Sequence, residues 1–167
     1  MELNEQASTM NRLPAEFSSD ALSRLQSNRL DWQQLKGSPK FDYPIDYSVA
    51  VTHVDQAAGI IEFIARWAPN SYCHYHRHLG RTISRVLHGE HHIVETTELQ
   101  ILHKTRRPGF QGQTPAGDLH MEYGGPDGTT VIFLCEAVDG NVFDIVAKDG
   151  ALLATATLDD FASGRLR

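Results

Sequence analysis

Apolar residues in this chain fall into short runs that turns interrupt, and none of these runs has the length of a long helix. From about residue 47 onward, apolar side chains either alternate with polar ones or form short stretches of β-branched and aromatic residues, which is the pattern of half-buried and buried strands. Turns that contain glycine separate the stretches. The pattern predicts strands at 47–54, 59–67, 71–77, 82–87, 91–96, 99–103, 129–136, 142–146 and 151–155.

Many short strands at regular spacing, without long helices between them, indicate an all-β sandwich or barrel. Short helices are expected near its two ends. Ser18 and the residues after it offer N-cap chemistry for a helix over about 19–29, and Thr157 offers it for a helix over 158–165.

The length of 167 residues suits one well-filled hydrophobic core. We expect residues 47–167 to form a single domain and residues 1–46 to form an N-terminal arm that carries the first helix. Residues 1–16 are polar and aperiodic, so we expect this part of the arm to be flexible or loosely docked.

Composition argues against several partners and compartments. The net charge of -6 disfavours binding to nucleic acid or to an anionic membrane surface. The longest clean apolar run, 131–135, is too short to span a bilayer, and the N-terminus shows no secretory signal. Cys73 and Cys135 do not suggest a disulfide framework. We therefore expect a cytoplasmic protein.

The histidines are concentrated in one part of the chain. Six of the nine lie between His74 and His92, and His74, His76 and His78 occupy alternate positions. In a strand these three side chains share one face, which leaves Cys73 on the opposite face. Imidazole is the commonest protein ligand for transition metals, so the cluster predicts a metal site.

Two motifs around these histidines resemble those of the cupin superfamily. The first contains His76 and His78 and ends at Gly89, and the second, P-x-G-x-x-H, ends at His120. The resemblance covers about residues 47–147 and implies a double-stranded β-helix, the jelly-roll barrel of cupins. It also implies a mononuclear metal site whose ligands are His76, His78 and His120.

The chain departs from the family pattern at Thr82, where many cupins have a glutamate ligand. Two alternatives follow. The metal is held by three neutral imidazoles alone, as in the three-histidine cupin dioxygenases, or Glu95 supplies a carboxylate from a neighbouring strand. Glu90 and Glu98 are weaker rivals of Glu95.

Further side chains are candidates for contact with a substrate. Of the consecutive pair His91 and His92, one is expected to face inward and one outward. The candidates for a role beside the metal are His74, Tyr72, Arg66 and Arg81, for each of which a packed or salt-bridged side chain is the alternative. The residues interpreted as core or pocket wall are Phe63, Trp67 and Phe133.

The resemblance also extends to activity. The chain is similar to single-domain cupin dioxygenases, such as the 2,4'-dihydroxyacetophenone and acetylacetone dioxygenases. This implies a non-haem Fe(II) enzyme that cleaves a carbon–carbon bond in a small diketone or aromatic hydroxyketone, with Zn, Ni or Mn as alternative metals. The implied partners are a small-molecule substrate, dioxygen and a second copy in a homodimer. Two other functions stay open: a metal-dependent isomerase or lyase in which the ion is a Lewis acid, and a ligand-binding or sensor cupin.

Overall fold

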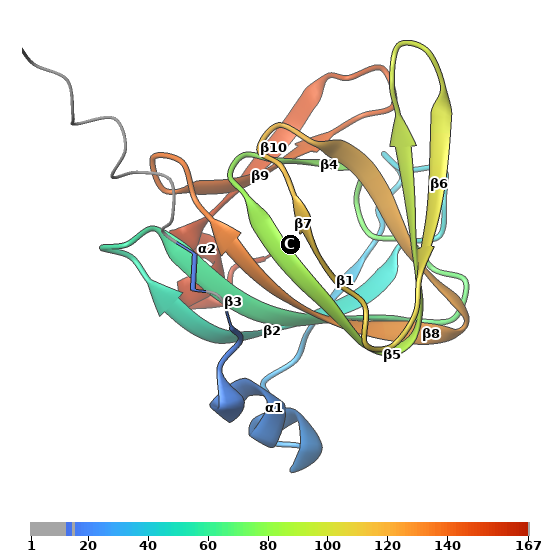
Figure 1. Cartoon of the computed structure of the whole chain (residues 1–167). Coiled ribbons are helices and arrows are strands. Elements are labelled where there is room, and N and C mark those ends of the chain that lie inside the picture. The colour runs from blue at the N-terminus through green and yellow to red at the C-terminus, as the bar shows by residue number, and fades with distance from the viewer. Residues whose placement is uncertain (1–12, 15, 167) are drawn as a thin grey trace, which may run out of the picture.

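Ten strands and two short helices make up the computed structural model, which describes residues 13, 14 and 16–166 (Figure 1). The strands form one antiparallel sheet that curls into a half-closed barrel, which confirms the predicted all-β jelly-roll architecture. The elements are α1 (Ser19–Gln26), β1 (Gln33–Lys36), β2 (Asp46–Asp55), β3 (Ile60–Trp67), β4 (His76–His78), β5 (Thr82–Thr96), β6 (Ile101–Arg106), β7 (Gln111–Thr114), β8 (Leu119–Glu136), β9 (Asn141–Val146), β10 (Leu152–Thr157) and α2 (Leu158–Ser163).

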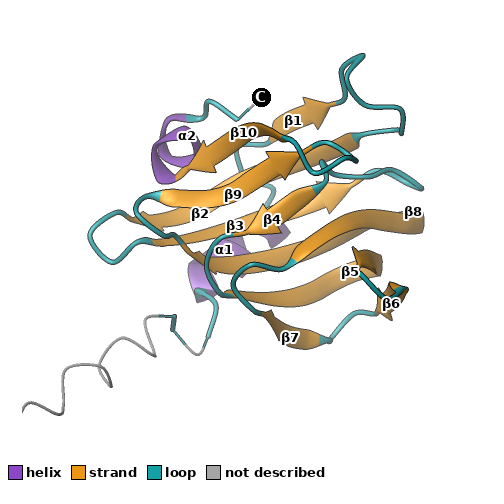
Figure 2. Cartoon of the chain, turned by 90° about the horizontal axis from the view of Figure 1, so that it is seen from above, coloured by secondary structure: helices purple, strands orange, loops and turns teal. Residues whose placement is uncertain are grey.

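Strand β8 joins the two sides of the barrel. It pairs with β5 along most of its length, with β4 through its first residues and with β3 through its second half. On one side the sheet continues from β5 to β6 and β7, and on the other it follows the path β1–β2–β3–β8–β4–β9–β10 (Figure 2). Segments far apart in the sequence therefore meet around β8.

A bend at Gly89 lets β5 run through both parts of the barrel as one strand. Gly89 has a φ of 71°, and a side chain here would run into the carbonyl oxygen of Gly128 on β8. Glycine satisfies both the backbone conformation and the close approach. The pairing with β8 shifts register on each side of this bend. The strands predicted at 82–87 and 91–96 are therefore a single strand.

Strand boundaries depart from the predicted ones most where the histidines lie. A strand was predicted at 71–77, but the observed strand β4 contains only His76–His78. Strand β8 begins at Leu119, well before the predicted 129, because the glycine-containing segment around Gly124 continues the pairing with β5 instead of forming a loop. The short strands β1 and β7 lie in segments where no strand was predicted.

Strand β3 is buried on both faces because a different cluster packs against each. Phe63 and Trp67 belong to the main core inside the barrel. On the outer face, Ile64 packs with Ala21 of α1, which lies against the outside of the sheet (Figure 1). The N-terminal segment thus docks through α1, and it extends the sheet because β1 pairs with β2. The flexibility predicted for residues 1–16 concerns positions that lie mostly outside the described residues.

Ser18 caps α1 and fastens it to β3. Its hydroxyl oxygen accepts a hydrogen bond from the N–H of Ala21, and the hydroxyl donates to Oε1 of Glu62 at 2.7 Å. The N–H of Ser18 donates to Oε2 of the same carboxylate at 2.8 Å. Glu62 is buried and also accepts from the hydroxyl of Thr52 at 2.7 Å. These bonds compensate for the burial of the carboxylate.

Helix α2 closes one end of the main core. It begins with a capping box between Thr157, the predicted N-cap, and Asp160. Phe161 turns inward and stacks on Phe63 with ring centroids 5.4 Å apart. Gly164, with a φ of 68°, ends the helix earlier than predicted. Among the residues that the structure describes, no helix is long and apolar enough to cross a membrane.

Candidate metal centre

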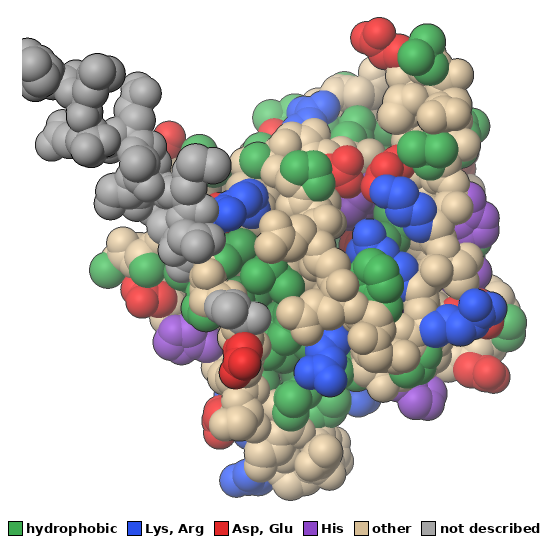
Figure 3. Space-filling view, viewed as in Figure 1, with side chains coloured by type: hydrophobic (Ala, Val, Ile, Leu, Met, Phe, Trp, Pro, Cys, Tyr) green, Lys and Arg blue, Asp and Glu red, His purple; other side chains and the backbone are tan. Residues whose placement is uncertain are grey.

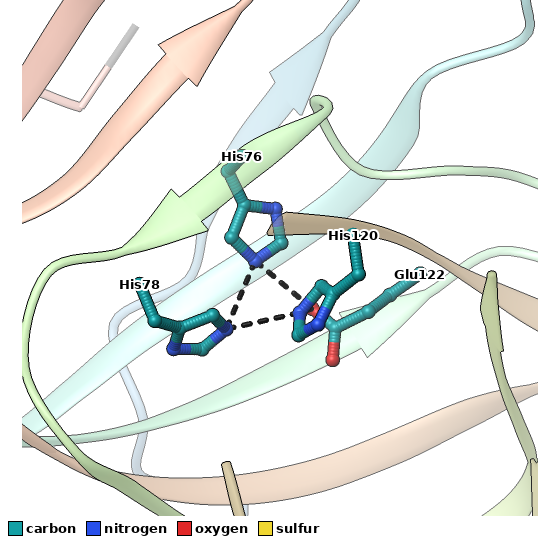
Figure 4. Close-up of side chains that lie close together, drawn as sticks. All are labelled: His76, His78, His120 and Glu122. Atoms are coloured by element: carbon teal, nitrogen blue, oxygen red, sulfur yellow. Dashed lines mark hydrogen bonds and ion pairs between the residues drawn. The ribbon is translucent and has the colours of Figure 1, made fainter. Parts of the chain in front are cut away.

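Three histidine rings meet inside the barrel with their Nε2 atoms close together (Figure 4). Nε2 of His78 lies 3.3 Å from Nε2 of His76 and 2.9 Å from Nε2 of His120. His76 and His78 share a face of β4 because they are alternate residues, and His120 stands opposite His76 on the neighbouring β8. All three rings are buried. Strand pairing therefore assembles the cluster that the sequence motifs predict.

Hydrogen bonds on the outer side of the rings determine which nitrogen faces the centre. Nδ1 of His76 donates to the carbonyl oxygen of His74 at 2.7 Å, and Nδ1 of His120 donates to Oδ2 of Asp118 at 2.8 Å. These oxygen atoms only accept, so the proton of each neutral ring sits on Nδ1. The lone pair of each Nε2 then points at the centre, as in metal-binding histidines.

Thr82 gives His78 the same orientation. Its hydroxyl oxygen lies 2.8 Å from Nδ1 of His78 and can accept that proton, while the hydroxyl donates to Sγ of Cys135 at 3.4 Å. All three groups are buried. The residue at the position of the expected glutamate therefore orients a histidine of the cluster and is not itself among its central donors.

A carboxylate that the sequence analysis did not identify, Glu122, completes the cluster. Glu122 follows His120 by two positions on β8 and so points to the same side of the strand. Its Oε2 lies 3.4 Å from Nε2 of His76 and 3.7 Å from Nε2 of His120. Its Oε1 accepts from Nε2 of the buried His91 at 2.8 Å. His91 thereby holds the carboxylate in place against the three rings.

Burial and mutual charge set the protonation of the cluster. Burial lowers the pKa of His76 to about 4, helped by the charge of His120, and it holds the pKa of His78 well below its usual value. Burial also lowers the pKa of His120, but the negative charges of Glu122 and Asp118 outweigh it and raise this pKa to about 9. Against the same desolvation, His120 and His91 hold the pKa of Glu122 well below its usual value. The centre therefore favours one positive charge beside Glu122.

The donors of this cluster fit a divalent transition metal. One ligand atom from each of His76, His78, His120 and Glu122 lies within 4.8 Å of the others. Three imidazole nitrogens and one carboxylate oxygen suit Fe, Zn, Ni and Mn, and they leave coordination positions open on a six-coordinate ion. A cation here would neutralise the buried charge of Glu122 and engage lone pairs that are otherwise costly to bury.

The cluster borders a cavity of about 560 Å³. Histidine and carboxylate side chains of the centre form part of its wall, and apolar side chains form most of the rest. Exposed cationic residues also line it, namely Lys36, Lys40 and Arg165. The aromatic residues in the wall include Tyr47, Phe63, Trp67, Phe133, Phe143 and Phe161. This confirms that Phe63, Trp67 and Phe133 are core and pocket wall.

Glu95, the predicted fourth ligand, lies outside the group of four. Its residue stands opposite His120 in the pairing of β5 with β8, so it shares a face with that histidine. The carboxylate, however, accepts from Nζ of Lys104 at 2.8 Å, and its near neighbours are ligand atoms of Asp118 and His120. Among the residues that the structure describes, Glu95 has no contact with His76 or Glu122. A role for Glu95 as metal ligand therefore stays a prediction, and these contacts do not support it.

Of the residues proposed beside the metal, His74 alone lines the cavity. Tyr72 packs its ring against Tyr123 instead. Arg66 is exposed over the ring of Trp32, since its neighbour on β3 faces inward and the side chains of a strand alternate. Arg81 forms two hydrogen bonds of 3.1 Å with the carboxylate of Glu136. The salt-bridged and packed alternatives therefore describe these three residues.

The alternation of side chains along a strand predicted the orientation of Cys73 and of the pair His91 and His92. Cys73 is buried, with Sγ 3.7 Å from Nδ1 of His76, so the prediction that it faces outward is wrong. Residues 73–75 lie before β4 and outside any strand, so the alternation of strand side chains does not extend to them. His91 faces inward and His92 lies on the other face of β5, as predicted. For Glu122 a signal existed: H-x-E at 120–122 repeats the alternate spacing of His76 and His78.

Comparison of sequences finds nothing similar: no family model and no curated protein matches the chain. Comparison of structures does. A protein from Methylibium petroleiphilum that is assigned as an acetylacetone dioxygenase superposes with a TM-score of 0.65 at 17% identity, over 93% of this chain and 96% of that one. An acetylacetone dioxygenase from Acinetobacter johnsonii superposes with a TM-score of 0.61 at 15% identity, over 98% and 96%.

A third similar structure is an RmlC-like cupin protein from Ralstonia eutropha, with a TM-score of 0.61 and 13% identity over 83% of this chain and 80% of that one. At such identities the likeness concerns the fold. It agrees with the curled antiparallel sheet of this chain. This chain therefore has the fold of the cupin proteins.

Proposed function

We propose that this protein is a mononuclear non-haem iron dioxygenase that cleaves a carbon–carbon bond in a small diketone or aromatic hydroxyketone. The observation that carries the proposal is the buried cluster of His76, His78, His120 and Glu122 at the wall of an apolar cavity. In such a reaction one carbon–carbon bond breaks and both atoms of one dioxygen enter the products, so no further reductant is consumed. The bound ion would supply electrons to dioxygen and positions for substrate oxygen atoms.

The residues of the chain prepare the site for this chemistry. The bonds from Asp118 and Thr82 hold the rings of His120 and His78 with Nε2 directed inward. The hydrogen bond of His91 keeps Glu122 in place at the centre. Because these hydrogen bonds already hold the side chains in position, binding of the metal requires little rearrangement of the protein.

The cavity supports a small carbonyl compound with an apolar body. Its volume of about 560 Å³ lies in the range of small-molecule sites. The aromatic rings of Trp67, Phe133 and Phe143 exclude water from the space beside the ligands and offer flat surfaces to a planar substrate.

A histidine of the cavity wall is held where it can meet a substrate oxygen. The hydroxyl group of Tyr47 and Nδ1 of His74 are 2.9 Å apart. This bond occupies Nδ1 and leaves Nε2 as the remaining polar atom of the ring, since the described residues give it no partner. Burial lowers the pKa of His74, so the ring is neutral at pH 7 and can donate or accept a hydrogen bond.

Similar structures add limited support. Two of them are named for acetylacetone dioxygenase, but their identities of 17% and 15% establish a common fold and leave activity to be tested. The homodimer implied by the family resemblance also stays a proposal. Measuring the molar mass in solution by light scattering tests it.

Glu122 is the observation that favours a second candidate. A ligand set with an anionic carboxylate also suits Zn(II), Mn(II) or Ni(II) acting as a Lewis acid, as in a metal-dependent isomerase or lyase. The two candidates differ in one measurable respect, because only the first consumes oxygen.

The decisive experiment is oxygen uptake by protein loaded anaerobically with Fe(II), on a panel of diketones and hydroxyacetophenones. We expect uptake equal to the substrate consumed and label from ¹⁸O₂ in both fragments. Protein loaded with Zn(II) and the His76→Ala variant are the inactive controls, and His53→Ala, which changes an exposed histidine on β2, is the active one. Conversion by the Zn(II) form without oxygen would establish the second candidate. Silence of every metal form across the panel would favour a ligand-binding cupin.

A further inference from the structure

A second group of histidines lies on the outside of the barrel. His92 on β5 and His103 on β6 share the outer face of the sheet, because His92 pairs with Thr105 and His103 stands two residues before it on the same strand. Tyr123 of β8 is the other neighbour of His92, and the two rings stack with centroids 4.5 Å apart. In the space-filling view, histidine side chains reach the surface at the edge of the molecule where β6 lies (Figure 3).

One nitrogen atom of the His92 ring faces one nitrogen atom of the His103 ring. Nδ1 of His92 lies 3.0 Å from Nε2 of His103. The hydroxyl of Tyr123 lies 3.0 Å from the same Nε2, and the hydroxyl of Thr105 lies 3.2 Å from Nδ1 of His92. Polar atoms from three strands thus surround one point at the surface.

Glu90 orients the more buried ring of this pair. Its Oε2 accepts from Nε2 of His92 at 3.0 Å. Since a carboxylate only accepts, the neutral ring carries its proton on Nε2 and presents the lone pair of Nδ1 to His103. His103 is exposed, and its own proton can move to Nδ1, for which the described residues offer no partner. Both facing nitrogens are then available as ligands.

We propose that His92 and His103 form a second, surface-exposed site for a divalent transition metal, separate from the buried centre and best suited to Cu(II) or Ni(II). Two nitrogens 3.0 Å apart, each about 2.1 Å from one ion, subtend about 90° at it. That angle matches neighbouring positions of a square-planar or octahedral ion, whereas tetrahedral Zn(II) prefers nitrogens about 3.4 Å apart. Water would complete the coordination.

The outer site and the buried centre use opposite faces of the same strand. His91 and His92 are consecutive on β5, and His91 bonds to Glu122 of the buried centre, whereas His92 bonds to Glu90 at the surface. The two sites share no ligand. The outer site can therefore be removed without disturbing the centre, and this inference does not depend on the proposed activity.

Equilibrium dialysis of the full-length protein against Cu(II), and separately against Ni(II), tests the outer site. We expect His103→Ala to bind one equivalent less than the unaltered protein and to keep its thermal stability, since His103 is exposed. His53→Ala and His88→Ala, which each remove another exposed histidine, should bind as many equivalents as the unaltered protein. Equal binding by His103→Ala, or an equal loss in either control, would overturn the proposal.

A second measurement identifies the ligands. In the electron paramagnetic resonance spectrum of the Cu(II) protein, we expect one signal with coupling to two nitrogens that disappears in His103→Ala. Glu90→Gln should weaken that site about tenfold and leave the remaining equivalents unchanged, because it removes only the orienting partner of His92. A two-nitrogen signal that persists in His103→Ala would assign it to other residues.

Discussion

The hydroxyl oxygen of Thr82 lies 2.8 Å from Nδ1 of His78, at the position in the chain where the family pattern has a metal-binding carboxylate. Thr82 therefore orients His78, one of the candidate ligands, and does not itself offer a donor to the centre. The carboxylate of the centre comes from Glu122 on another strand.

Replacing Thr82 by valine should weaken metal binding without creating a cavity in the core. Valine keeps the volume of threonine but removes the partner of Nδ1 of His78, and the loss of such an orienting bond costs about 10-fold to 100-fold in metal affinity. Competition with a chelator of known affinity measures this change. Thr82→Ser restores the hydroxyl and should recover most of the affinity; equal weakening in both variants would assign the effect to packing.

Glu122→Gln should weaken metal binding more than Glu95→Gln. The first change removes the negative charge beside Nε2 of His76 and Nε2 of His120, whereas the second removes a carboxylate that is paired with Lys104. Metal content after dialysis, measured by elemental analysis, compares the two variants. Full metal content in Glu122→Gln together with metal loss in Glu95→Gln would restore Glu95 as the fourth ligand.

Metal affinity should rise with pH up to about pH 9. In the metal-free protein the carboxylates around His120 raise its pKa to about 9, so this ring holds a proton at neutral pH that a metal must displace. His76, with a pKa of about 4, is already neutral and adds no pH dependence in this range. Zinc titrations from pH 6.5 to 8.5 should therefore show an affinity that increases about tenfold per pH unit.

The matched variant for this pH dependence is Asp118→Asn. Asp118 raises the pKa of His120 by a hydrogen bond and by its charge, so its removal should lower that pKa and flatten the rise. Calorimetry in buffers of different ionisation enthalpy counts the protons that zinc releases. The same slope in both proteins would show that another group carries the proton.

Ser18→Ala should loosen the N-terminal helix and destabilise the fold. The change removes the cap of α1 and one of the bonds that satisfy the buried Glu62. A cap and a buried hydrogen bond are each worth about 1 kcal/mol, so we expect a loss of about 1–3 kcal/mol in the free energy of unfolding. Chemical denaturation measures it, with Ser19→Ala at an exposed neighbouring position as the control.

Much of the fold follows from local patterns that the structure preserves. The predicted strands at 47–54, 59–67 and 142–146 correspond to β2, β3 and β9, because each alternates or buries apolar residues without interruption. Thr157 caps the last helix as its chemistry predicts. The parts that local pattern misses depend on pairing: β8 extends through glycines that read as a turn because β5 lies beside it to complete its hydrogen bonds.

The candidate site divides in the same way. The histidines at 76, 78 and 120 carry motif spacing, so they could be identified before the structure. Glu122 stands in a segment that was not predicted to be a strand, and its relation to His76 exists only once β8 pairs with β4. The place of Glu95 depends on Lys104 of β6, a partner that no spacing within the motifs reveals.

The cavity wall includes Arg165 and Leu166, the last two residues that the structure describes. A peptide fused after these residues would therefore begin close to the cavity wall. A polyhistidine tag at that end would also bring its own imidazoles near the cavity that borders the candidate metal centre. Purification for metal analysis and for activity assays is accordingly best served by a cleavable tag without histidine at the opposite terminus.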